Sequence, residues 1–171
     1  MKKIFKQKKG FTLIELIIAI AVLSIFTLAA ANIMFPVLNT YFETQKLADS
    51  NMVCSSVLDT IRKDVSIATD KPEVSQDGHK ISLNCKYGKT EYFSGEDRSG
   101  NLEYGKGFLY RSDVKDALTK PVFDDSFYKD KTIEIVFDET KTNVYKITAS
   151  VFDGEELICS QNTLITPLIY K

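Results

Sequence analysis

The hydrophobic pattern begins with an uninterrupted apolar run near the start of the chain. Residues 11–35, FTLIELIIAIAVLSIFTLAAANIMF, contain a single charged side chain, Glu15. Because a helix rises about 1.5 Å per residue, this run reaches about 37 Å, enough to cross the hydrocarbon core of a bilayer. The pattern therefore predicts a transmembrane helix that keeps one carboxylate, although a charge deep in such a helix costs about 2.5–3.5 kcal/mol.

The apolar positions after Pro36 have the spacing of an amphipathic helix. Steps of three and four residues separate Cys54, Val57, Leu58, Ile61 and Val65. Between residues 11 and 68, Pro36 is the only helix breaker, and its ring crowds the carbonyl four residues back, that of Asn32. We therefore predict one long helix, kinked or locally opened at Asn32 and Pro36, which ends at the Lys-Pro pair of residues 71–72.

Beyond residue 72 the period changes from that of a helix to that of strands. Alternating or β-branched segments occupy residues 81–87, 89–93, 107–111, 132–137, 143–152 and 156–165. Asp153-Gly154 separates the last two segments and predicts a hairpin. We expect a loop at 94–106 and a loop or short helix at 113–130. The predicted fold is α+β: a long kinked N-terminal helix packed on a mainly antiparallel β-sheet.

The charged residues are distributed unevenly between the segment before the apolar run and the rest of the chain. Five lysines and no acid precede the apolar run, whereas the remainder carries 17 basic and 23 acidic residues, a net charge of −6. The basic start predicts a cytoplasmic N-terminus, and the acidic exterior argues against nucleic acid as a partner. We expect a basic leader at 1–10, a transmembrane helix at 11–36, its amphipathic continuation at 37–69, and an extracytoplasmic β-rich domain at 70–171.

Few residues suggest chemistry. The three cysteines allow one disulfide, for which Cys85 and Cys159 are the candidate pair, or three unpaired thiols. His79 is the only histidine, no GxSxG occurs, and the carboxylates Asp124, Asp125 and Asp130 match no calcium-loop spacing. We therefore predict no catalytic residue, no metal site and no cofactor.

The residues around Glu15 are the most specific motif. Thr12-Leu13-Ile14-Glu15 has the form of a capping box, which explains why an acid is tolerated at the helix start. The longer stretch from Lys9 to Glu15, KGFTLIE, followed by about twenty apolar residues, resembles the class III signal of type IV pilins and pseudopilins. Over residues 1–36 the resemblance is one of sequence motif. From there to residue 68 it is one of architecture, and beyond residue 68 it concerns only the fold class.

The resemblance implies a life cycle for the chain. A prepilin peptidase would cleave between Gly10 and Phe11 on the cytoplasmic side, and Phe11 would become an N-methylated N-terminus. The apolar helix would hold the subunit in the membrane and then enter the core of an extracellular or periplasmic filament. Glu15 would pair with the terminal amine of a neighbouring pilin subunit. Expected partners are thus other pilin subunits, the prepilin peptidase, the membrane and the inner-membrane assembly platform.

The resemblance has one departure and one refinement. Many major pilins carry a proline where this chain has Asn32, and here the nearest is Pro36. Residues 58–65 and 107–111 are similar to segments of minor pseudopilins of the J-like or W-like kind, which would prime assembly at the tip. Three alternatives stay open: an adhesion module displayed on the pilus, a single-pass anchored protein unrelated to pili, and a secretory signal cleaved after Ala31.

Overall fold

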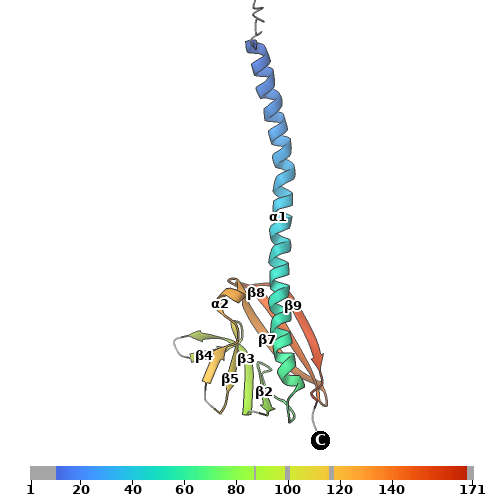
Figure 1. Cartoon of the computed structure of the whole chain (residues 1–171), viewed down its shortest axis with the longest axis vertical. Helices are drawn as coiled ribbons and strands as arrows, with labels where there is room; N and C mark the ends of the chain where they lie inside the picture. Colours follow the sequence, from blue (N-terminus) through green and yellow to red (C-terminus); the bar gives the residue numbers. More distant parts are fainter. Residues whose placement is uncertain (1–10, 87, 99–100, 116–117, 169–171) are drawn as a thin grey trace, which may run out of the picture. The chain divides into compact units, whose positions relative to one another are not determined.

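The computed structural model describes residues 11–86, 88–98, 101–115 and 118–168. The chain divides into two compact units, Met1–Gln45 and Lys46–Lys171, and each is described by itself. Figure 1 shows the elements of both units, coloured along the sequence. Gly10, the expected residue before the cleavage site, lies outside the described residues.

A single 54-residue helix, α1 (Leu13–Ser66), runs through both units. At its C-terminal end the hydrogen bonds span three residues instead of four: the amides of Ile67 and Ala68 donate to the carbonyls of Asp64 and Val65 at 3.3 Å. Asn32 and Pro36 both lie within the continuous helix, so the helix is not interrupted there. The kink expected at these two residues stays a prediction.

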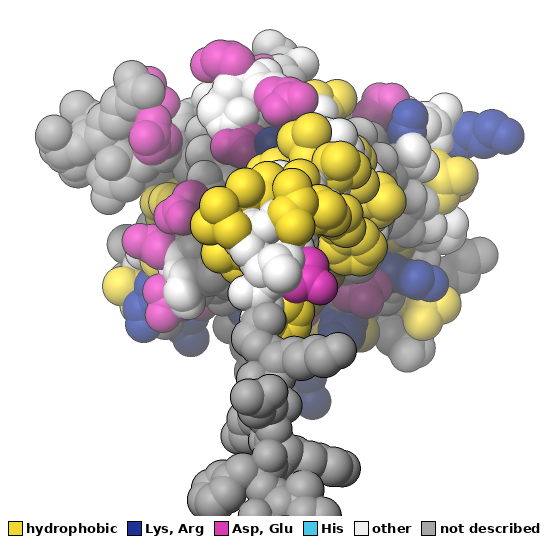
Figure 2. Space-filling view, turned by 90° about the horizontal axis from the view of Figure 1, so that it is seen from above, with side chains coloured by type: hydrophobic (Ala, Val, Ile, Leu, Met, Phe, Trp, Pro, Cys, Tyr) yellow, Lys and Arg dark blue, Asp and Glu magenta, His cyan; other side chains and the backbone are white. Residues whose placement is uncertain are grey.

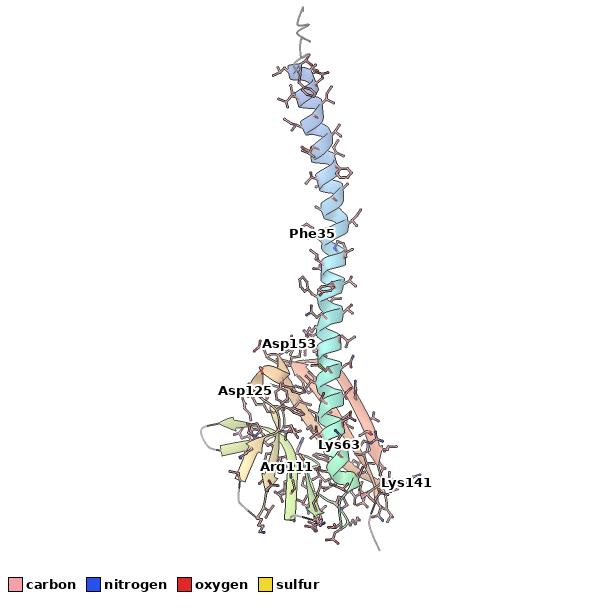
Figure 3. All side chains as sticks on the ribbon, viewed as in Figure 1. Phe35, Lys63, Arg111, Asp125, Lys141 and Asp153 are labelled. Carbon is pink, nitrogen blue, oxygen red and sulfur yellow. The ribbon has the colours of Figure 1, made fainter. Side chains whose placement is uncertain are left out.

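The first unit consists of the apolar half of α1. Its large hydrophobic side chains are exposed, among them Phe35, which is labelled in Figure 3. The few hydroxyls in this half bond to the helix itself: Ser24 Oγ donates to the Ile20 carbonyl and Thr27 Oγ1 to the Leu23 carbonyl, each at 2.8 Å. The hydroxyls of Ser24 and Thr27 therefore need no hydrogen-bond partner outside the helix, which suits an apolar environment.

The second unit contains two antiparallel sheets. The first sheet has the order β1-β2-β3-β5-β6, and β4 pairs with the far end of β3. Its strands are β1 (Glu73–Val74), β2 (Lys80–Cys85), β3 (Gly88–Arg98), β4 (Asn101–Tyr104), β5 (Phe108–Asp113) and β6 (Leu118–Pro121). A short helix, α2 (Asp125–Tyr128), leads from β6 to the second sheet.

The second sheet is a three-stranded meander of β7 (Thr132–Lys141), β8 (Val144–Asp153) and β9 (Glu156–Ile165). Strand β8 alternates buried and half-buried residues along most of its length, as the period-2 sequence pattern predicts. The expected hairpin between β8 and β9 is present. Gly154 supplies its left-handed conformation, with φ of 59°, which costs least at glycine.

The two sheets meet along the outer edge of β7. Successive amides on that edge donate to three different segments of the first sheet: Ile133 N–H to the Gly107 carbonyl at 2.8 Å, Ile135 N–H to Ser94 Oγ at 2.9 Å, and Phe137 N–H to the Gly78 carbonyl at 2.8 Å. A strand edge that would otherwise expose unpaired donors is thereby satisfied.

The core lies between the sheets and the second half of α1, whose turns cross the face of β7, β8 and β9 in Figure 1. The helix contributes the stripe expected from the sequence, Cys54, Val57, Leu58, Ile61 and Val65, and in addition Val53. Each fully buried aliphatic side chain stabilises the fold by about 1.5–3 kcal/mol. The α+β prediction, with a long N-terminal helix on antiparallel sheets, is confirmed.

One local prediction was wrong and one was incomplete. Residues 94–106, expected as a loop, contain the end of β3 and all of β4, which form a hairpin. Gly, Ser, Asp and Asn in this stretch are typical of turns, but here pairing with neighbouring backbone overrides residue preference. The 113–130 stretch contains the expected short helix and also the edge strand β6.

Candidate processing and assembly segment

The candidate segment starts at the N-terminus of α1, where Thr12 and Glu15 cap the helix. The backbone N–H of Thr12 donates to Glu15 Oε2 at 2.8 Å, and the Thr12 hydroxyl donates to the same oxygen at 2.9 Å. In return, Glu15 N–H points at Thr12 Oγ1 at 3.4 Å. This is the reciprocal arrangement that the sequence predicts, and it orders the first turn around the carboxylate.

Glu15 has no basic side chain near it among the described residues of the first unit. Residues 11–45 contain no Lys or Arg, and Glu15 and Glu43 are their only charged side chains. The carboxylate borders an open apolar surface formed by Ile18, Ala19, Val22, Leu23 and Phe26. In lipid or in a packed protein, an ionised carboxylate without a positive partner is costly.

The rest of the segment is a hydrophobic helix surface. Phe11 is 91% exposed and Phe26 72% exposed, and Figure 2, which looks down on the near end of the helix, shows hydrophobic side chains gathered there. By length and composition, α1 is able to cross a membrane. An exposed surface of this size on a soluble protein would aggregate, so it requires lipid or other helices around it.

The cysteines are placed differently from the sequence-based expectation. Cys159 Sγ lies 3.4 Å from Cys54 Sγ, whereas Cys85 stands on β2 of the other sheet and borders a cavity with Asp64 and Arg111. The geometry thus favours Cys54 over Cys85 as the neighbour of Cys159. The sequence held a signal for this: Cys54 belongs to the core stripe of the helix, and Cys159 shares its strand phase with the buried Ile165.

That cavity has a volume of about 300 Å³, and two of its lining residues, Asp64 and Arg111, belong to a small polar network. Tyr92 Oη donates to Asp64 Oδ2 at 2.7 Å, and the Arg111 guanidinium lies 3.6 Å from the same carboxylate. Burial, with the Asp64 carboxylate as a second cause, raises the pKa of Tyr92 well above its ordinary range. No local pattern in the sequence predicts this network, which links the end of α1 to β3 and β5.

The other candidate residues are not brought into a group. His79 lies in the turn before β2, and its Nδ1 has no hydrogen-bond partner. Among the residues that the structure describes, no set of three or more His, Cys, Asp or Glu side chains is placed to hold a metal ion, and this includes Asp124, Asp125 and Asp130.

Comparison with known proteins identifies the N-terminal segment. Residues 5–31 match the profile of the prokaryotic N-terminal methylation motif. Separate comparisons of the whole chain with curated proteins and with solved structures return no match. The matched residues include Phe11, Thr12 and Glu15, whose geometry is described above, and they continue through the exposed apolar helix. Residues 5–31 therefore carry the prokaryotic N-terminal methylation motif, which is the class III signal of type IV pilins.

Proposed function

We propose that this protein is a minor pilin-like subunit of a type IV pilus or a related filament. The observation that carries the proposal is the methylation motif at residues 5–31, which leads directly into an exposed apolar helix whose one charged residue is Glu15. The motif supports a substrate of prepilin peptidase of the pilin or pseudopilin kind. The minor role, the assembly code and the orientation are our further steps.

The first proposed step is cleavage between Gly10 and Phe11. The five lysines of the leader keep residues 1–10 in the cytoplasm, and the remainder of the chain after α1 is outside. Gly10 lacks a side chain, which lets the backbone of the scissile bond enter the protease. After cleavage, Phe11 carries the new amine, which becomes N-methylated, and the helix cap formed by Thr12 and Glu15 lies directly behind it.

The second proposed step is assembly through Glu15. In the single chain, the carboxylate accepts from the amide and hydroxyl of Thr12, but these neutral donors do not cancel its charge. The amine on Phe11 of a neighbouring subunit supplies the missing cation. A carboxylate and an ammonium are each costly alone in an apolar core and much less costly together. Misregistered docking would leave both charges unpaired, so the pair selects the register.

The processing step is tested by the mass and N-terminal sequence of the mature protein. We expect a chain that begins at N-methylated Phe11, and Gly10→Leu should accumulate as the uncut precursor. Gly10→Ala is the matched control, because a methyl group is small enough to keep substantial cleavage. A mature chain that begins at Asn32 would instead reveal signal-peptidase cleavage and would overturn the proposal.

The assembly step is tested by Glu15→Gln, which keeps the shape and the hydrogen-bonding capacity of the side chain but removes its charge. We expect normal cleavage and loss of incorporation into filaments. The matched control is Glu43→Gln, which removes the other acid of the first unit, outside the apolar run. Incorporation of Glu15→Gln at the level of the unmodified protein contradicts the register argument.

The minor role is tested by immunogold labelling of filaments. Rare or terminal label supports a minor subunit that primes assembly, and we expect its deletion to abolish filaments. Label along the whole shaft would make the protein a major subunit. A deletion that spares filaments but removes adhesion would favour a displayed binding module. In all three outcomes, the cleavage experiment stands on its own.

A further inference from the structure

Two cysteines that are far apart in the sequence face each other in the second unit. Cys54 lies on α1 and Cys159 on β9, 105 positions later, and their Sγ atoms are 3.4 Å apart. Cys54 is fully buried, and its thiol also donates to the Ala149 carbonyl at 3.4 Å. Cys159 is half-buried, so a reagent from solvent reaches this sulfur first.

The helix is held over β9 by polar contacts on both sides of Cys54. Ser55 Oγ donates to Gln161 Oε1 at 3.1 Å, and Gln161 Nε2 donates to Asn51 Oδ1 at 3.0 Å. Asn51 and Ser55 lie one turn apart on α1, so Gln161 binds both and fixes the rotation of the helix about its axis. The side chains of Asn51, Ser55 and Gln161 therefore help to hold the two thiols next to each other.

We propose that Cys54 and Cys159 form an intramolecular disulfide that fastens α1 to β9 once the second unit meets a disulfide oxidant. A disulfide requires an S–S distance of about 2.05 Å, so the sulfurs must approach by about 1.4 Å. Small rotations of the two side chains supply that movement. The proposed bond differs from the Cys85–Cys159 pair expected from the sequence, since Cys85 lies on the other sheet.

The oxidation proceeds by thiol–disulfide exchange with a small-molecule or protein disulfide. The half-buried Cys159 reacts first: its thiolate attacks one sulfur of the oxidant, forms a mixed disulfide and releases the other oxidant sulfur as a thiolate. Cys54 Sγ then attacks Cys159 Sγ, the second oxidant sulfur leaves as a thiolate, and that thiolate takes up the proton that Cys54 gives up. Two protein thiols are oxidised to one disulfide, the oxidant disulfide is reduced to two thiols, and the electrons balance.

The order of attack follows from the environment of the two sulfurs. Burial, strengthened by contact with Cys159, raises the pKa of Cys54 to about 12. Cys54 is therefore a protonated, poorly nucleophilic thiol at neutral pH and a poor initial attacker. Its role is to resolve the mixed disulfide, for which its position next to Cys159 Sγ is sufficient.

The bond would add a covalent link to a strand at the edge of its sheet. β9 is an edge strand of its sheet, paired only with β8 among the strands that the structure describes. Linking it to α1 closes a loop of roughly a hundred residues, and cross-links of long loops restrict the unfolded chain most. The inference goes beyond the proposed function, and only its occurrence in cells rests on the proposed outward placement of this unit.

The test uses the full-length chain in detergent, incubated either with oxidised glutathione or with dithiothreitol, and then denatured and alkylated with N-ethylmaleimide. We expect three adducts on the reduced chain and one adduct, on Cys85, on the oxidised chain. Peptide mapping of the oxidised chain should show the Cys54 and Cys159 peptides joined. Three adducts after oxidation, or a linkage that includes Cys85, would overturn the proposal.

Variants and thermal unfolding complete the experiment. Cys85→Ser, the matched control, should keep the Cys54–Cys159 linkage, and Cys159→Ser should lose it. Oxidation should raise the unfolding midpoint of the unmodified chain by about 10 °C. This comparison needs no substitution, so it decides the question even if Cys159→Ser folds poorly. An unchanged or lower midpoint would refute the fastening of α1 to β9, while the Phe11 cleavage assay would remain unaffected.

Discussion

At the scale of single residues, the structure depends on polar side chains that satisfy particular backbone groups. Thr12 and Glu15 do this at the start of α1, in an arrangement that local spacing predicts. Ser94 does it between the sheets: its fully buried hydroxyl accepts from the Ile135 amide on the edge of β7. Nothing in the sequence near Ser94 marks it, because Ile135 is 41 positions away.

Ser94→Ala tests the importance of this hydroxyl. The substitution leaves the buried Ile135 amide without an acceptor, so we expect the free energy of unfolding to fall by about 1–3 kcal/mol. Chemical denaturation of the second unit, followed by near-UV circular dichroism, measures the loss. Ser126→Ala is the control, because Ser126 is exposed on α2 and should change stability by less than about 0.5 kcal/mol. Equal effects of the two substitutions would contradict the assignment.

At the scale of elements, the β3–β4 hairpin, in a stretch expected to be a loop, depends on a close backbone contact. Strand β3 pairs with both β4 and β5, and Gly95 lies where the two pairings meet, opposite Tyr104 and Phe108. The chain between β4 and β5 passes so close to Gly95 that a Cβ on Gly107 would lie 1.8 Å from the Gly95 carbonyl oxygen. Glycine at this position permits both the hairpin and the Gly107–Ile133 bridge to the second sheet.

Gly107→Ala should therefore destabilise the second unit by about 3 kcal/mol, because the obstructing atoms are backbone and cannot rotate away. Gly105→Ala is the matched control: Gly105 also has a positive φ, of 136°, but a Cβ there would meet no atom within 4 Å. We expect it to cost about 1 kcal/mol from conformational strain alone. Thermal unfolding of the two variants measures the difference, and a Gly105→Ala loss as large as that of Gly107→Ala would remove the steric explanation.

At the scale of the whole molecule, the second unit buries ionisable groups that the fold keeps neutral. Tyr128 accepts from the Leu109 amide at 3.0 Å, and Tyr145 donates to the Pro72 carbonyl at 2.9 Å. Burial raises the pKa of both tyrosines to about 12. Between pH 10 and 12 the unfolded chain loses these protons while the folded chain keeps them, so stability is full below about pH 10 and falls above it.

Alkaline unfolding checks this consequence. The thermal midpoint of the second unit should stay constant up to about pH 9.5 and then fall steadily towards about pH 12. Tyr145→Phe removes one of the titrating groups and should flatten the fall, although it also loses the bond to Pro72. Ser126→Ala, at an exposed position without an ionisable side chain, should leave the pH profile unchanged. A midpoint that does not decline above pH 10 would contradict burial of neutral tyrosines.

Local and periodic information was enough to predict a large part of this protein. The apolar run at 11–35, the core stripe from Cys54 to Val65, the Thr12–Glu15 cap and the hairpin at Gly154 each depend on residues a few positions apart. The methylation motif is also a contiguous pattern. These features follow from the sequence alone, because helix and strand periods and capping geometry are set by near neighbours.

Only the tertiary structure decided which distant residues meet. It placed Cys159 beside Cys54 and left Cys85 on the other sheet, and it put the Ser94 hydroxyl on the Ile135 amide. It also turned the Gly-rich stretch before Gly107 into a hairpin. These contacts depend on the order in which strands pair and on the rotation of α1 over β9. Sequences with the same local pattern could pair their strands in another order or rotate the helix differently. The strand order and the helix rotation are therefore determined only when the whole core packs together.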